Sequence, residues 1–177
     1  MSNHHLNIEI KAYLRDIATI RQVLTNHKAT FKGIDHQIDT YFECHSGRLK
    51  LRKGNIENNL IHYERENSKE PKASIVSLYA IGSDTEKLKN VLSNALQVKV
   101  VVDKKREIYF VKNVKFHIDE VLHLGSFVEI EAIDIDGTLG QKRLEEQCRY
   151  FMQAFNIQEK DLIHQSYSDL LLEKLST

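Results

Sequence analysis

Cysteine is scarce in this sequence: only Cys44 and Cys148 occur among 177 residues, and neither belongs to a CxxC pair. Two such cysteines provide neither a disulfide framework nor the paired thiols of a structural zinc site. The histidines lack HxxxH or a similar spacing, which also argues against zinc. Proline occurs once, and the chain has no low-complexity tract and no internal repeat. We therefore expect a single domain over residues 1–177.

An excess of charge of either sign is also lacking. Lys and Arg together number 25, as do Asp and Glu, so the net charge is formally zero and predicts no general attraction to nucleic acid or to an acidic membrane. No apolar run approaches the roughly 18 residues of a transmembrane helix, and no apolar signal segment begins the chain. The 41% hydrophobic content suffices for a core. We expect a cytoplasmic protein that binds neither nucleic acid nor membranes.

Alternation of apolar and polar residues is the main pattern that is present. From Leu6 to Leu14, apolar residues recur at every second position, which predicts an amphipathic strand. Segments rich in aromatic and β-branched residues predict seven more strands, over residues 36–44, 46–55, 59–67, 72–81, 98–111, 114–124 and 126–134. Helical spacing predicts helices over residues 16–27 and 83–96, with Asp16 as the N-cap of the first, and a helical end over about 139–175.

The order of these elements predicts the fold class. Consecutive strands joined by short turns favour an antiparallel meander, and eight strands are enough to close a barrel. We therefore predict an α+β protein. An eight-stranded antiparallel closed β-barrel would occupy about residues 6–134, with flanking helices and C-terminal helices over about 139–175.

The charged residues of the predicted strands share one face. Arg48, Lys50 and Arg52 lie on one side of their strand, and Leu49 and Leu51 lie on the other. The same separation recurs in other strands, whose polar faces carry Glu9, Lys11, Tyr63, Arg65, Lys72, Ser74, Lys104, Arg106, His117, Asp119, Glu129 and Glu131. For any single strand, a sheet with one face in water explains this pattern. Its repetition with Arg, Lys, Asp and Glu favours a barrel whose charged face is turned inward and whose apolar face lies outward, under the helices.

Such an interior would need a charged occupant. A buried, unpaired cation costs several kcal/mol, so an interior lined with cations must hold water, a polyanion or both. Carboxylates can hold a hard divalent cation, which prefers oxygen ligands. Cations, carboxylates and a divalent ion together are typical of a site for a phosphate chain.

The N-x-E-x-K of Asn7, Glu9 and Lys11 resembles the E-x-E-x-K signature of the CYTH family, the triphosphate tunnel metalloenzymes. Further segments are similar to this family in matching order, from about Leu6 to Asp134: HQIDTYFECHSGRLKLR, LIHYERENSKEPKAS, VVDKKREIYF and FHIDEVLHLGSFVEIEA. They most resemble the branch that contains the class IV adenylate cyclases.

The resemblance implies an eight-stranded barrel that forms a triphosphate tunnel and binds its substrate with Mg²⁺ or Mn²⁺. The implied activity is that of an adenylate cyclase, which converts ATP to cyclic AMP and pyrophosphate. Two alternatives stay open: a hydrolase of thiamine triphosphate or inorganic tripolyphosphate, and a non-catalytic module that binds a triphosphate or polyphosphate. The resemblance is also compatible with a homodimer, to which the apolar C-terminal helices would contribute.

The resemblance also assigns roles to individual residues. The implied metal ligands are Glu9, Glu129 and Glu131. The implied phosphate contacts are Lys11, Arg48, Lys50, Arg52, Arg65, Lys72, Lys104 and Arg106. Lys11, Arg106 and Asp119 would act in catalysis, with Asp119 either assisting removal of a proton or pairing with Arg106. His117 is expected to be structural, because a lone histidine usually is, and Lys105 and Glu107 are expected outside the barrel.

Asn7 departs from the family pattern, because it stands where the family usually has its first glutamate. An amide oxygen can bind a metal but brings no charge. We therefore expect Asn7 to weaken the binding of a second metal ion more than the binding of substrate, since phosphate oxygens commonly complete the coordination of Mg²⁺.

Overall fold

The structure is a computed structural model that describes residues 4–64, 72–82 and 84–176. In this part of the chain, the strands are β1 (His4–Tyr13), β2 (Thr30–Phe42), β3 (Arg48–Lys53), β4 (Asn59–Glu64), β5 (Lys72–Ala80), β6 (Val98–Val111), β7 (Val114–Val121) and β8 (Gly125–Asp134). The helices are α1 (Ile17–Asn26), α2 (Thr85–Ala95), α3 (Gly140–Ala154) and α4 (Tyr167–Leu175), with a short 3₁₀ helix, η1 (Glu159–Asp161).

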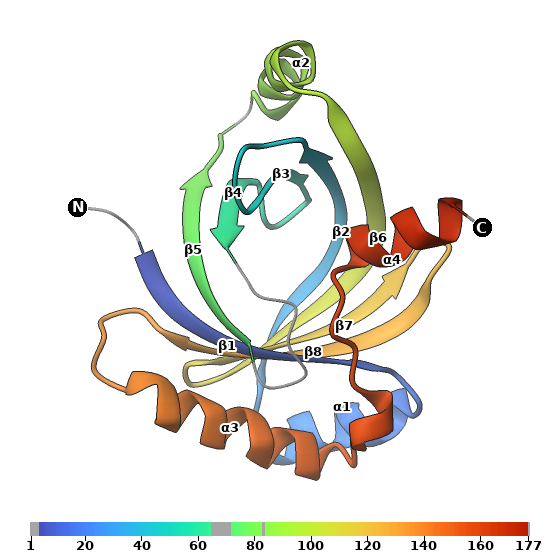
Figure 1. Cartoon of the computed structure of the whole chain (residues 1–177). Helices are drawn as coiled ribbons and strands as arrows, with labels where there is room; N and C mark the ends of the chain where they lie inside the picture. Colours follow the sequence, from blue (N-terminus) through green and yellow to red (C-terminus); the bar gives the residue numbers. More distant parts are fainter. Residues whose placement is uncertain (1–3, 65–71, 83, 177) are drawn as a thin grey trace.

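All eight strands pair antiparallel, in the order β1-β5-β4-β3-β2-β6-β7-β8, and β1 also pairs with β8 (Figure 1). The prediction of an α+β protein with eight antiparallel strands and flanking helices is confirmed. The meander is present only in part. Strands β2 to β5 and β6 to β8 follow one another, whereas β1 lies between β5 and β8 because α1 carries the chain away from β1 before β2 begins.

Strand β2 begins at Thr30, six residues before the predicted start at residue 36. Its first half pairs with the end of β6, from Thr30 opposite Phe110 to Asp35 opposite Arg106. The pairing shifts register between Phe31 and Gly33, and Gly33 has a φ of 134°. This irregularity breaks the alternation of apolar and polar residues, which is why the pattern did not show the strand.

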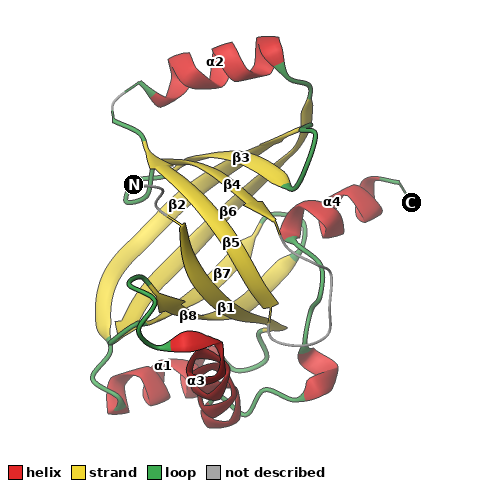
Figure 2. Ribbon diagram, turned by 60° about the vertical axis from the view of Figure 1, so that its left-hand side comes forward, coloured by secondary structure: helices red, strands yellow, loops and turns green. Residues whose placement is uncertain are grey.

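The main hydrophobic core lies outside the ring of strands, between β1, β7 and β8 on one side and α1 and α3 on the other. Figure 2 shows α1 and α3 against this part of the sheet, while α2 stands at the opposite end. Phe116 is fully buried here and meets the ring of Phe151 edge to face at 4.7 Å. The apolar faces of these three strands therefore point outward, as predicted. Asp16 caps α1 by accepting from the N–H groups of Ala18 and Thr19.

Helix α4 covers a second cluster, in which Tyr167 and Leu171 pack against Val100 and Val102 of β6 and Phe127 of β8. Its first turn is fixed by a capping box between Ser166 and Asp169. Within the described ranges, none of the helices is long and apolar enough to cross a membrane.

Candidate functional site

A cavity of about 250 Å³ lies inside the ring of strands, and all eight strands contribute to its lining. Among the described residues, six cations and five carboxylates line it: Lys11, Lys50, Arg52, Lys104, Arg106, Lys115, Glu9, Asp39, Glu57, Glu129 and Glu131. Alternation within each strand explains this arrangement, because the faces opposite the outer core point inward. The charged faces thus line the same cavity.

The carboxylate of Asp39, in β2, binds three of these cations. It accepts from Lys104 at 2.8 Å, from Lys50 at 3.2 Å, and from Nε and Nη2 of Arg52 at 2.8 and 2.9 Å. Burial alone would raise the pKa of Asp39, but the three cations outweigh burial and hold it well below its usual value. Burial also lowers the pKa of Lys104 to about 7, although Asp39 opposes that shift. These cations are held at fixed positions around one buried carboxylate.

Glu129 of β8 is a second such centre. It accepts from Nη2 of Arg106 at 2.7 Å and lies 3.2 Å from Nζ of Lys11. Burial would raise the pKa of Glu129, but Arg106 and Lys11 overcome it and keep the pKa well below the usual range. Burial, together with Arg106, lowers the pKa of His117. Nδ1 of His117 lies 3.1 Å from Glu129 and acts as donor, since a carboxylate only accepts.

Oxygen atoms gather at the junction of β1 and β8. Glu9 lies directly opposite Glu131 in the β1–β8 ladder, and both line the cavity. Asn7 donates from Nδ2 to Glu131 at 2.5 Å. Its side chain is only 4% exposed, and its Oδ1 atom has no hydrogen-bond partner within the described part of the chain. A buried, unpaired carbonyl oxygen is costly unless something binds it.

The cavity also has an apolar side. Ile61 and Tyr63 of β4 and Val76 and Leu78 of β5 line it, facing the charged strands. Tyr167, the first residue of α4, also lines the cavity, and Nζ of Lys11 lies 4.0 Å from the centre of its ring. A ligand that enters this space meets both charged and aromatic surfaces.

Two predicted site residues whose side chains the structure describes, Arg48 and Asp119, do not line the cavity. Arg48 instead binds Asp169 of α4 at 2.9 Å. Asp119 lies behind Arg106, which it binds through both carboxylate oxygens at 2.6 and 2.5 Å. Lys72 stands opposite Glu9 in the β1–β5 ladder, but its side chain is outside the described ones, and Arg65 lies outside the described residues altogether.

The family model of the CYTH domain matches residues 5–167. The chain belongs to the CYTH family. Among curated proteins, none matches the sequence significantly. Several solved structures share the fold. The PH1012 protein of Pyrococcus horikoshii OT3 is 24% identical, with a TM-score of 0.80 over 93% of this chain and 98% of that one.

Two other solved structures with this fold have named activities. A protein from Vibrio parahaemolyticus, described as a proposed adenylate cyclase, is 18% identical, with a TM-score of 0.74 over 94% of this chain and 98% of that one. HpAC1 from Hippeastrum, a proposed adenylyl cyclase described as having a dominant triphosphatase activity, is 12% identical, with a TM-score of 0.63 over 98% of this chain and 96% of that one. At these identities the likeness shows the fold alone.

Triphosphate tunnel enzymes of the CYTH family are metal-dependent, and several side chains of this cavity carry oxygen atoms that suit a metal ion. In the described part of the chain, no three Asp, Glu, His or Cys side chains gather closely enough to form a metal cage. Glu9, Glu131 and the unpaired Oδ1 of Asn7 nevertheless offer oxygen atoms side by side. Mg²⁺ and Mn²⁺ prefer such ligands, and Mg²⁺ usually takes its remaining ligands from water and phosphate. The residues therefore fit an ion that is bound together with a substrate.

The sequence did not single out three charged residues of this CYTH cavity, Asp39, Glu57 and Lys115. Lys115 has the same parity as His117 and Asp119, and Asp39 has the same parity as Tyr41, so sorting those strands by alternation would have found both. His117 was expected to be structural but lines the cavity. Glu57 lies in the loop between β3 and β4, where no periodicity marks a direction.

Proposed function

We propose that this CYTH protein is a metal-dependent enzyme that acts on a triphosphate inside a closed barrel. One observation carries the proposal: among the described residues, six cations and five carboxylates line one cavity inside the ring of strands. A triphosphate has the negative charge and the extended shape that such a space would accept.

The proposed roles follow from position. Lys11, Lys50, Arg52, Lys104 and Arg106 bind phosphate oxygens, with Lys72 and Arg65 as further candidates outside the described side chains, and Arg48 as a contact nearer α4. Glu9, Glu129 and Glu131 would hold Mg²⁺ or Mn²⁺, together with the amide oxygen of Asn7. The ion, when bound, polarises phosphate oxygens and offsets charge that develops in the reaction. Because Asp119 binds Arg106 and accepts from Tyr167 at 2.8 Å, we assign it to holding Arg106 in place.

The reaction that we favour is that of a class IV adenylate cyclase. The ribose 3′-hydroxyl of ATP attacks the α-phosphorus, the bond to pyrophosphate breaks, and the hydroxyl proton passes to water. Lys11 and Arg106 bind the leaving pyrophosphate and stabilise its charge. The apolar side of the cavity, formed by Ile61, Tyr63 and their neighbours on β5, supports a substrate with an organic group rather than an inorganic chain.

Hydrolysis is the second candidate, since a structural neighbour, HpAC1, is described as having a dominant triphosphatase activity. The same side chains would present the terminal phosphorus to water, with thiamine triphosphate or tripolyphosphate as further substrates. A catalytically inactive binding module is the third candidate, because Asn7 removes one carboxylate from the family motif. A homodimer stays a prediction.

A substrate panel distinguishes these activities. We expect purified protein with Mg²⁺ or Mn²⁺ to convert ATP to cyclic AMP and pyrophosphate, and to leave thiamine triphosphate and tripolyphosphate largely intact, as measured by chromatography of the products. Glu9→Gln should lower kcat/KM by about tenfold or more, because it removes a proposed metal ligand. Glu43→Gln, at an exposed carboxylate that pairs with Lys99 outside the cavity, is the matched control and should leave activity unchanged.

Other products would favour the rivals. Orthophosphate from ATP or tripolyphosphate without cyclic AMP indicates a hydrolase. Tight triphosphate binding without any product indicates a binding module. Failure to bind any triphosphate in the presence of metal contradicts the proposal as a whole.

A further inference from the structure

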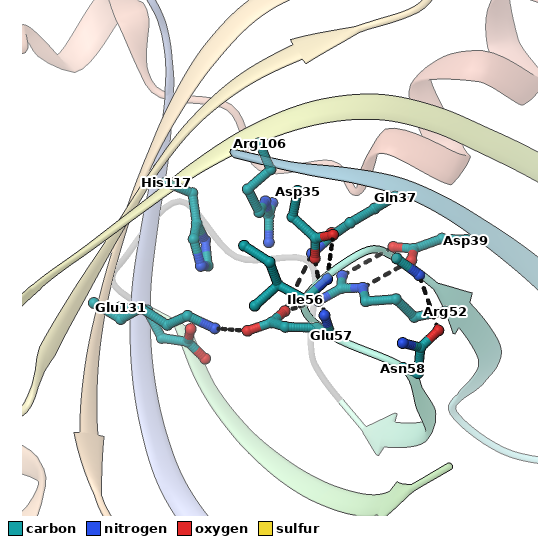
Figure 3. A network of polar contacts seen from close by, with 12 residues as sticks. Asp35, Gln37, Asp39, Arg52, Ile56, Glu57, Asn58, Arg106, His117 and Glu131 are labelled. Carbon is teal, nitrogen blue, oxygen red and sulfur yellow. Dashed lines mark hydrogen bonds and ion pairs between the residues drawn. The ribbon is translucent and has the colours of Figure 1, made fainter. Parts of the chain in front are cut away.

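Glu57 reaches the cavity from a loop instead of a strand. Residues 54–58 join β3 to β4, and the carboxylate of Glu57 binds Nη1 of Arg52 at 2.9 Å and Nζ of Lys115 at 2.5 Å (Figure 3). Arg52 belongs to β3 and Lys115 to β7, and both β2 and β6 lie between these strands in the sheet. The carboxylate therefore connects two separate walls of the barrel across its interior.

The loop that carries Glu57 is held by a buried carboxylate. Asp35 of β2 is fully buried and accepts from the backbone N–H groups of Asn55 at 2.5 Å, Ile56 at 2.8 Å and Glu57 at 3.1 Å. At Gly54, a Cβ atom would lie 2.7 Å from both oxygens of Asp35, so a side chain there would push the loop away. Three backbone hydrogen bonds to one carboxylate, with a glycine that permits the close approach, fix the position of Glu57.

The side chain of Glu57 is ionised in this position. Burial would raise its pKa, but Lys115 and Arg52 outweigh burial and lower the pKa well below its usual value. Gln37, itself buried, donates to both Asp35 at 2.8 Å and Glu57 at 3.2 Å. Nε and Nη2 of Arg52 bind Asp39, and its Nη1 binds Glu57. A phosphate group beside Glu57 would meet a fixed negative charge and cations that already have partners.

We propose that Glu57 ends the phosphate-binding part of the cavity and thereby selects triphosphates over longer phosphate chains. The inference rests on the proposed function, since it concerns the same cavity. A fourth phosphate group would have to displace the Glu57 carboxylate from Arg52 and Lys115, or lie beside it. Both alternatives cost binding energy, the first by breaking two ion pairs and the second by like-charge repulsion. Selection against a longer ligand by a fixed repulsive group is a common source of specificity.

The test compares dissociation constants for two inorganic probes, tripolyphosphate and tetrapolyphosphate, each with Mg²⁺, by isothermal titration calorimetry on the full chain. We expect the unchanged protein to bind tripolyphosphate about tenfold or more tightly than tetrapolyphosphate. Glu57→Ala opens the space and Glu57→Gln removes only the charge, so both should reduce this preference by about tenfold. Glu86→Gln, at an exposed carboxylate that pairs with Lys53 on the surface, is the matched control and should keep the preference.

Thermal unfolding of each variant checks its fold, and Glu57→Gln decides the question if Glu57→Ala does not fold. If the unchanged protein binds tripolyphosphate but both variants keep the same preference, the role of Glu57 as an end stop is wrong while the proposed function stands. If the unchanged protein binds neither chain, the proposed function fails and this inference fails with it.

Discussion

At the scale of single residues, Lys104 is a buried cation whose presence the stability of the fold does not explain. Lys104 is 2% exposed and donates to the buried Asp39 at 2.8 Å. Replacing a buried ion pair by well-packed apolar residues is often neutral or stabilising, so stability does not explain why Lys104 is there. An anionic ligand that needs the ammonium group does explain it.

Lys104→Met should therefore separate binding from folding. We expect the affinity for tripolyphosphate with Mg²⁺ to fall about tenfold or more. The free energy of unfolding at neutral pH should change little, because Asp39 keeps its hydrogen bonds to Lys50 and Arg52 and the cost of burying the ammonium group of Lys104 is removed. Lys105→Met, at the neighbouring exposed position, is the control and should bind normally. Calorimetry and urea unfolding measure the two quantities. Loss of several kcal/mol of stability with unchanged binding would show that Lys104 is structural.

The lowered pKa of Lys104 also predicts that the free energy of unfolding depends on pH. The pKa of Lys104 is lowered from 10.5 to about 7 in the folded protein, first by burial. Between these two values the unfolded chain binds more protons than the folded one, so the free energy of unfolding rises with pH in this window. The rise between about pH 7 and 9 should reach up to about 2 kcal/mol and should be absent in Lys104→Met. Equal slopes of stability against pH in both proteins would contradict the shifted pKa.

At the level of residues, the sequence predicted most of the cavity because alternation assigns each strand residue to a face. Glu9, Lys50 and Arg106 were placed on the inner face in this way, and the structure has them lining the cavity. Asp119 shares this parity, and the structure has it paired with Arg106, which was one of its two predicted roles. Alternation could not show its bond to Tyr167, which comes from a distant part of the chain. It could not place Glu57 either, because a loop has no period from which to read a direction.

At the level of elements, the hydrophobic core belongs to the outside of the barrel. Leu144 of α3 is fully buried against the outward faces of the strands. Because the core and the cavity lie on opposite faces of the same strands, the core should support the fold without contacting a ligand.

Leu144→Ala should lower the free energy of unfolding by about 2–5 kcal/mol, because it leaves a space in a close-packed core. Leu175→Ala makes the same change at the end of α4, where the side chain is 77% exposed, and should have little effect. Urea unfolding measures both. The affinity of Leu144→Ala for tripolyphosphate, measured at a temperature at which it is folded, should match that of the unchanged protein, and a large loss would show that the core and the cavity are coupled.

The sequence predicted the type and approximate bounds of these elements better than their arrangement. The spacing of apolar residues and the N-cap at Asp16 located α1. Similar spacing predicted a helical end over about 139–175, whereas the structure has α3, the short η1 and α4, which begins only at Tyr167. A closed meander pairs its first strand with its last, as β1 and β8 do, but the sequence did not show that the other neighbour of β1 is β5. An apolar face specifies what a strand covers, but the neighbours of a strand depend on contacts between residues far apart in the sequence.

For the whole molecule, the net charge of zero conceals a local arrangement of charge. The described lining of the cavity holds six cations and five carboxylates, so without a ligand the charges nearly balance. A triphosphate adds several negative charges to this cavity, and the available cations already bind carboxylates. Divalent ions that enter with the triphosphate would restore the balance.

This balance predicts that triphosphate binding depends on a divalent ion. Tripolyphosphate with Mg²⁺ or Mn²⁺, at about 100 times its dissociation constant, should raise the free energy of unfolding by about 2.7 kcal/mol, whereas tripolyphosphate with EDTA should have almost no effect.

Asn7→Glu tests where the ion binds. Asn7 donates to Glu131 at 2.5 Å, so a second carboxylate there would repel Glu131 until an ion lies between them. The variant should be less stable than the unchanged protein in EDTA and should gain more from the metal with tripolyphosphate, as measured by thermal unfolding. Equal stabilisation by tripolyphosphate with and without EDTA would show instead that the lysines and arginines alone accommodate the phosphate chain.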